Sequence, residues 1–85
     1  MEYLIVAFRS RAHTIKFANL LRSQNFAMEI INTPKEAGVG CGLSVKIRKQ
    51  NYEMVKKLVL LSALSSFAGF FTVKEFGDKR IVRTV

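Results

Sequence analysis

The sequence is short of cysteine, of histidine and of long apolar runs, and the first two shortages already remove several classes of protein. Cys41 is the single cysteine and His13 the single histidine among the 85 residues. An internal disulfide needs two cysteines, and a structural zinc site needs about four Cys or His ligands. Disulfide scaffolds and four-ligand zinc sites are therefore excluded, and we expect neither a metal site nor a bound cofactor.

Membrane spans and leader segments are also not predicted. No apolar run approaches the ~20 residues that cross a bilayer, and the start Met1-Glu2-Tyr3 lacks the basic residues of a secretory signal. We therefore expect a soluble, cytoplasmic protein that does not enter a membrane.

Acidic residues are scarce compared with basic ones. Six Asp plus Glu stand against 14 Lys plus Arg, which gives a net charge of +8 with His uncharged. Nearly half of the residues are apolar, which argues against disorder. A chain of this length forms one small domain that buries only roughly 60–65% of its unfolded surface. We therefore expect a single basic domain, residues 1–85, with a modest core.

Short strand-like and helix-like segments alternate along the chain. Apolar runs and period-two patterns predict strands over 4–8, 26–32, 43–48 and 69–76, and a short fifth strand over 80–84 after the Gly77-Asp78 turn. Helical spacing predicts helices over 11–24 and 50–64. The order βαββαβ predicts an α+β, ferredoxin-like split βαβ sandwich, an antiparallel sheet with two helices on one face. Residues 76–85 are then a C-terminal hairpin extension.

Two patterns within these segments predict surfaces. Leu43, Val45 and Ile47 alternate with polar residues, so the strand over 43–48 is expected to have one solvent-exposed face. The apolar stripe of the helix over 50–64 is unusually broad, because Leu60, Leu61 and Leu64 widen it. We expect some of that stripe to contact a second copy, as in a homodimer.

Residues 35–42 form a glycine-rich loop that carries the thiol of Cys41. A right-handed crossover through the helix over 11–24 makes the first two strands parallel, so their ends lie at the same edge of the sheet. That helix begins where the loop lies. We therefore expect Cys41 to be near the residues at its start, which are Arg9, Ser10, Arg11 and His13.

A thiol in such a place is expected to be ionised. Free cysteine titrates near ~8.5, and a helix N-terminus with nearby Arg or His⁺ lowers that value. Alternating glycines also allow successive backbone N–H groups to converge on an anion. The candidate anion-stabilising groups around Cys41 are Arg9, Ser10, Arg11, His13, Gly40 and Gly42. The plainer alternative is an inert, packed cysteine with Arg9 and Arg11 as solvated charges.

Three segments together resemble the family of selenium/sulfur carrier-like proteins, over roughly residues 3–76. They are Phe8-Arg9-Ser10, Ile30-Ile31-Asn32-Thr33-Pro34 and Cys41-Gly42-Leu43-Ser44. The resemblance implies that Cys41 is the carrier position, which holds a persulfide or selenide and passes it from a donor protein to an acceptor protein. It also implies a carrier with a reactive thiol, and the tail from Gly77 to Val85 is an addition to the family's usual end.

Exposed cations are candidates for partner binding, and they also raise a nucleic-acid alternative. Lys35 beside the loop is placed to attract an acidic donor surface, and the most concentrated basic group comprises Lys46, Arg48, Lys49, Lys56 and Lys57. Of these we single out Lys35, Lys46 and Arg48 as partner-binding residues. RNA-binding sheets of this topology need aromatic residues on their open face. The first strand offers Tyr3 and Phe8 and the third offers none, so RNA binding is the less favoured interpretation.

Two further classes stay open. Sandwiches of this type also act as dimeric regulatory modules that bind a small ligand, although no segment specifies one. A hydrolytic enzyme would need Cys41, His13 and an acid, for which Glu36 is the nearest in sequence. We favour a carrier over a true enzyme.

Overall fold

The computed structural model describes residues 1–39 and 42–85, and Gly40 and Cys41 lie outside the described residues. Every predicted helix and strand is present, with shifted ends. The elements are β1 (Glu2–Phe8), α1 (Arg11–Ser23), β2 (Met28–Asn32), the 3-10 helix η1 (Lys35–Ala37), β3 (Leu43–Ile47), the 3-10 helix η2 (Lys49–Asn51), α2 (Tyr52–Ser62), β4 (Phe67–Phe76) and β5 (Lys79–Thr84). β2 begins two residues later than predicted, and α2 is shorter at both ends, because η2 and a left-handed Ala63 bound it.

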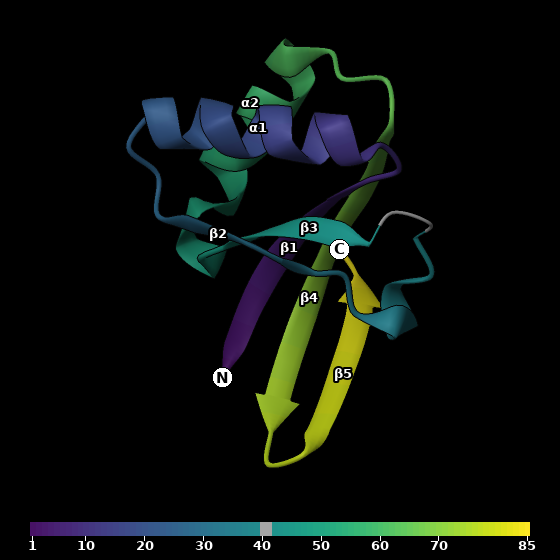
Figure 1. Ribbon diagram of the computed structural model, residues 1–85. Coiled ribbons are helices and arrows are strands. Elements are labelled where there is room, and N and C mark those ends of the chain that lie inside the picture. Colours follow the sequence, from purple (N-terminus) through teal and green to yellow (C-terminus); the bar gives the residue numbers. More distant parts are fainter. Residues whose placement is uncertain (40–41) are drawn as a thin grey trace.

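The strands form one antiparallel sheet in the order β2-β3-β1-β4-β5. β1 and β2 both pair antiparallel with β3, so they run in the same direction, as the crossover through α1 requires. Both helices lie on the same side of the sheet (Figure 1). The α+β class is confirmed, and the strand order and helix count are compatible with a ferredoxin-like arrangement in which β5 extends one edge.

The larger core lies between the sheet and the two helices. α1 begins at Ser10, whose side chain accepts a hydrogen bond from the His13 backbone N–H, and it ends before Asn25, which takes the left-handed conformation (φ 63°). The buried side chains of this core come from both helices and three strands, β1, β3 and β4: Leu4, Val6, Phe8, Phe17, Ala18, Leu21, Val45, Ile47, Val55, Val59 and Phe70. Their burial holds α1 and α2 on one face.

The opposite face of the sheet is also covered around β1, which corrects the prediction of a solvent-exposed face on β3 at Ser44. A second cluster, comprising Tyr3, Ile5, Ala7, Phe71 and Val73, lies there, and Ala37, Val39 and Val82 pack against it. Ser44, predicted to face solvent, is 0% exposed. The physical reason is that Ala37 and Val39 pack over this face and that η1 contacts β5, as the positions of η1 and β5 in Figure 1 show.

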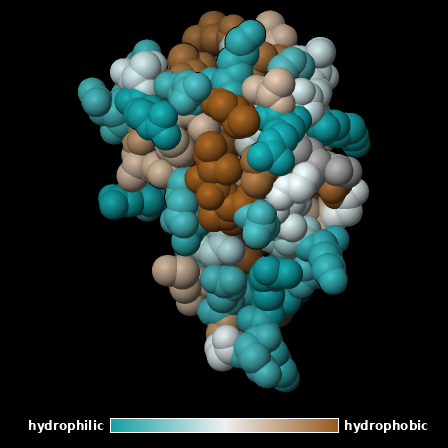
Figure 2. All heavy atoms as spheres, in the orientation of Figure 1, coloured by the Kyte–Doolittle hydropathy of each residue, from teal (hydrophilic) through white to brown (hydrophobic). Residues whose placement is uncertain are grey.

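Several large apolar side chains remain exposed on the surface. Leu60 and Leu61 of α2 are 74% and 80% exposed, while Val55 and Val59 of the same helix are buried. Figure 2 shows a further apolar band between α1 and β2, surrounded by hydrophilic side chains. The predicted pairing of two copies through α2 stays a prediction. None of the helices in the described ranges combines the length and apolarity needed to span a bilayer.

Candidate functional site

Three strand ends meet at the edge of the sheet where the cysteine loop begins and ends. Ser44 of β3 stands opposite Ala7 of β1 on one side and opposite Ile31 of β2 on the other. The last residues of β1 and β2 therefore lie next to the first residues of β3. This is the juxtaposition that parallel β1 and β2 predict.

The first turn of α1 contacts the start of β3 directly. Thr14 is completely buried, and the single hydrogen of its hydroxyl is shared between two carbonyl oxygens, which lie 3.2 Å (Ser10) and 3.4 Å (Leu43) from Oγ1. Leu43 is only two positions after Cys41 in the sequence. The N-terminal end of α1 is therefore held against the segment that follows the cysteine. No local sequence signal distinguishes Thr14 from an ordinary helix residue.

Side chains and backbone on both sides of the loop are anchored. Thr33 donates its backbone N–H to the carbonyl oxygen of Gly42 at 2.9 Å, and its hydroxyl lies 2.7 Å from the hydroxyl of Ser44. On the other side, Val39 packs against the second cluster. Gly38 has φ 67°, a left-handed conformation that favours glycine. The described residues on each side of positions 40 and 41 are thus tied to the sheet.

The predictions for Cys41 and Gly40 concern positions outside the described residues. Of the other predicted anion-stabilising residues, Gly42 is exposed, and Arg9 and Arg11 are exposed at the start of α1. Within the described ranges, neither arginine forms a side-chain ion pair. No acidic residue lies in the first turn of α1. This edge therefore presents positive charge that described carboxylates do not neutralise.

Ser66, which the sequence analysis missed, joins Ser10 to His13. Its Oγ accepts the Ser10 backbone N–H at 3.2 Å and lies 2.6 Å from Nδ1 of His13, while its carbonyl accepts the Arg9 N–H at 2.8 Å. A hydroxyl oxygen can accept a second hydrogen bond or donate its own hydrogen, so the Ser66 hydroxyl binds His13 Nδ1 in either neutral tautomer. No local sequence signal marks Ser66, since it is 53 positions from His13.

Residues 3–64 match the model of the family described as Putative Se/S carrier protein-like. The chain belongs to this family. The match ends just after α2, so it is shorter than the resemblance expected over 3–76, and β4 and β5 lie beyond it. Comparison with curated proteins and with solved structures found no match.

The acid considered for a hydrolytic site is engaged elsewhere in this carrier-family protein. Arg80 of β5 donates through Nη2 to Glu36 Oε1 at 2.9 Å and through Nε to Oε2 at 3.2 Å. The hydrogen bonds from Arg80 hold the pKa of the Glu36 carboxyl below its ordinary value. A carboxylate held in this way is poorly suited to orient His13. Among the described residues, no group of three or more His, Cys, Asp or Glu could hold a metal ion.

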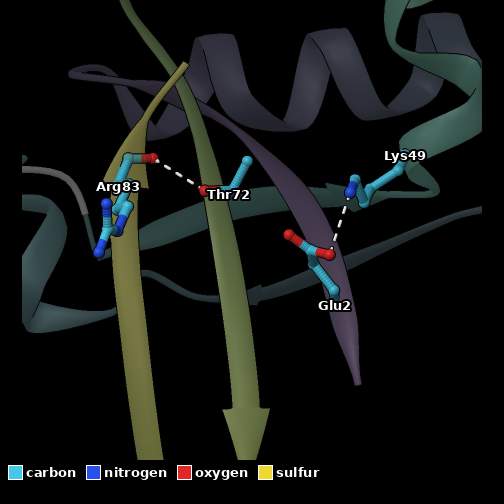
Figure 3. A network of polar contacts seen from close by, with 4 residues as sticks. All are labelled: Glu2, Lys49, Thr72 and Arg83. Atoms are coloured by element: carbon cyan, nitrogen blue, oxygen red, sulfur yellow. Dashed lines mark hydrogen bonds and ion pairs between the residues drawn. The ribbon is translucent and has the colours of Figure 1, made fainter.

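The predicted partner-binding cations are divided between two ends of the molecule. Lys35 lies in η1, within the cysteine loop, whereas Lys46 and Arg48 lie at the far end of β3, at a groove of about 590 Å³. Lys46 Nζ lies 4.4 Å from the centre of the Tyr3 ring, an attractive cation–π contact. Lys49 pairs with Glu2 at 3.0 Å (Figure 3) and lowers the pKa of that carboxyl. This groove is therefore separate from the edge at the cysteine loop.

The aromatic residues considered for base stacking are not available on the sheet. Phe8 is buried on the helix-covered face, with its ring centre 5.4 Å from that of Phe17, and Tyr3 is only 7% exposed. Burial raises the pKa of Tyr3 above its ordinary value. β1 and β3 thus offer no exposed aromatic platform for RNA. The net positive charge by itself does not distinguish one nucleic-acid sequence or strand type from another.

Proposed function

We propose that this protein carries sulfur or selenium on Cys41 and passes it from a donor protein to an acceptor protein. Membership of the carrier family supports the class of function. The observation that carries the assignment to this edge is the contact between Thr14 in the first turn of α1 and the carbonyl of Leu43. It ties the segment after the only cysteine to a helix N-terminus.

Electrostatics at this edge favour an anion on sulfur. A helix N-terminus carries partial positive charge, and α1 has no acidic residue in its first turn to offset it. Arg9 and Arg11 add two exposed cations beside that end. Such surroundings lower the pKa of a thiol, so the Cys41 sulfur is a thiolate at neutral pH without a separate general base.

The transfer step needs no oxidant or cofactor. The Cys41 thiolate attacks the terminal sulfur of a donor persulfide, and a new S–S bond forms as the bond between the two donor sulfurs breaks. The donor leaves as a thiolate, which takes a proton, and Cys41 holds the persulfide. The same displacement at the terminal selenium of a donor selenopersulfide gives Cys-S-Se⁻. A thiolate of the acceptor then attacks the terminal atom and releases Cys41.

The neighbouring residues have distinct roles in this proposal. Arg9 and Arg11 stabilise the terminal anion by charge, and the backbone N–H groups of Gly40 and Gly42 donate hydrogen bonds to it. His13 donates to the anion from Nε2, in the tautomer whose Nδ1 accepts from Ser66. Lys35 attracts an acidic surface on the donor or acceptor.

The experiment is incubation with a small-molecule persulfide followed by intact-mass analysis. The wild-type protein is expected to gain the mass of one sulfur atom, and dithiothreitol should remove it. Cys41→Ser is the matched control, and it tests the position directly because the chain has no other cysteine. An unchanged wild-type mass, or an equal gain in Cys41→Ser, would contradict carriage on Cys41.

A further inference from the structure

The C-terminal strand β5 holds the cysteine loop through a two-point ion pair. Both carboxylate oxygens of Glu36 in η1 accept from the guanidinium of Arg80, at 2.9 and 3.2 Å. These two parallel hydrogen bonds fix the orientation of the carboxylate relative to the guanidinium as well as their distance. A single contact between a lysine and a carboxylate fixes only the distance. Glu36 and Arg80 are 44 positions apart, so the contact joins two distant parts of the chain.

The same face of β5 supplies an apolar contact next to the ion pair. Arg80 and Val82 are two positions apart on a strand, so their side chains lie on one face. Val82 packs against the second cluster, as do Ala37 and Val39 from the loop. Residues 34–39 of the loop are therefore held by two kinds of contact, the ion pair between Glu36 and Arg80 and the apolar packing of Ala37 and Val39.

This contact acts on the chain just before Cys41. Val39 is two positions before the cysteine, and Glu36 is five positions before it. The segment after the cysteine is held separately, because Thr33 binds Gly42 and Thr14 binds Leu43. β5 lies beyond the family match over 3–64, so this restraint on the upstream side comes from a part of the chain that the family model does not include.

We propose that Arg80 is a positioning residue for the proposed carrier reaction. Arg80 holds the upstream side of the cysteine loop through Glu36 and thereby keeps Cys41 reactive. This inference rests on the proposed function, because it concerns the reactivity of the proposed carrier residue, Cys41. Breaking the ion pair gives residues 35–39 more conformational freedom, so the chain that leads into Cys41 is held less firmly. The thiolate then loses stabilisation, and its alkylation requires a higher pH.

The test uses Arg80→Gln and Glu36→Gln in the full chain, with Arg83→Gln as the matched control. Arg83 is also an exposed arginine on β5, but side chains alternate along a strand, so it lies on the opposite face from Arg80. Its carbonyl oxygen accepts from Thr72 Oγ1 (Figure 3), a backbone contact that Arg83→Gln leaves in place. All three variants must show the wild-type far-ultraviolet circular dichroism.

Two measurements are made on each variant. The first is the pH profile of Cys41 alkylation by iodoacetamide, and the second is amide hydrogen exchange at Ala37 and Gly38, whose N–H groups bind Pro34 and Lys35 within the loop. We expect Arg80→Gln and Glu36→Gln to exchange about two- to fivefold faster and to be alkylated about two- to fivefold more slowly at neutral pH, as suits an exposed ion pair. Their alkylation profiles should shift to higher pH, whereas Arg83→Gln should match wild type.

A charge-reversed pair completes the test. Glu36→Arg combined with Arg80→Glu should restore most of the wild-type rates, while each single reversal should not. The proposal is overturned if alkylation is unchanged or faster in Arg80→Gln, or if Arg83→Gln has the same effect. Neither readout requires persulfide transfer, so a failure of carriage on Cys41 and a failure of this positioning role give different results.

Discussion

Ser66 Oγ lies 2.6 Å from Nδ1 of His13 and also accepts the backbone N–H of Ser10. One hydroxyl at the start of β4 therefore holds two residues at the N-terminal end of α1. Since β4 pairs with β1 and α1 follows β1, this contact sets how the first turn of α1 sits on the sheet. That turn is where positive charge is presented to the cysteine loop.

We predict that Ser66→Ala destabilises the protein by about 1–3 kcal/mol, because it leaves part-buried polar groups without their partner. Urea unfolding followed by circular dichroism measures the change. Ser65→Ala is the control, since Ser65 is exposed and should alter the free energy of unfolding by no more than about 0.5 kcal/mol. Equal effects of the two substitutions would show that the Ser66 hydroxyl has no special role.

Thr14→Val is predicted to slow Cys41 alkylation and to reduce stability by about 1 kcal/mol. Valine keeps the shape of threonine but cannot donate to the carbonyls of Ser10 and Leu43. Thr14→Ser keeps the hydroxyl, so its alkylation profile should stay close to wild type even if the lost methyl group lowers stability. If the two variants react alike, the hydrogen bond from Thr14 does not position the segment after Cys41.

The pH dependence of Cys41 alkylation should differ between the folded and the urea-unfolded chain. We expect the folded protein to react with a midpoint below the unfolded one, which lies near ~8.5 for a free thiol. Arg9→Gln and Arg11→Gln should each move the folded midpoint upward, since each removes a cation from the start of α1. Lys57→Gln, an exposed cation on α2, serves as the control with the same change in charge. An alkylation midpoint of the folded protein at or above that of the unfolded chain would contradict the hypothesis that the thiol is activated.

Acid should weaken two surface ion pairs. The pKa of Glu2 is lowered by Lys49, and that of Glu36 by Arg80, both from an ordinary value of 4.5. A carboxyl whose pKa is lower in the folded state adds stability above its unfolded pKa, and this is lost as the pH falls through the folded value. The loss of thermal stability on acidification should therefore be smaller in Glu36→Gln than in wild type, measured as Tm near neutral pH and below pH 4.5. An identical loss in both proteins would argue against the Glu36–Arg80 pair in solution.

Local sequence signals were sufficient for the helices and strands. The helical spacing over 11–24 and the Gly77-Asp78 turn each depend on a few neighbouring residues, and each is present in the structure. The crossover rule then placed the ends of β1 and β2 at one edge, next to the start of β3. The start of α1 could thus be predicted to lie near the segment that contains Cys41.

The parts of the site that were not predicted all depend on contacts between distant residues. Ser44 carries the pattern of an exposed strand residue, yet it is buried because η1 folds over that face. Ser66 and Arg80 have no motif around them, and their partners His13 and Glu36 are 53 and 44 positions away. No periodicity or turn signal encodes such pairings.

The sequence by itself determined the order of elements, the excess of positive charge and the position of the only thiol next to glycines, because these follow from residue type and local spacing. Only the tertiary structure decided that β1 is buried on both faces, that Ser66 binds His13, and that Arg80 of β5 binds Glu36 in η1. The reason is physical: side chains far apart along the chain meet only after strand pairing and curvature of the sheet have brought their elements together.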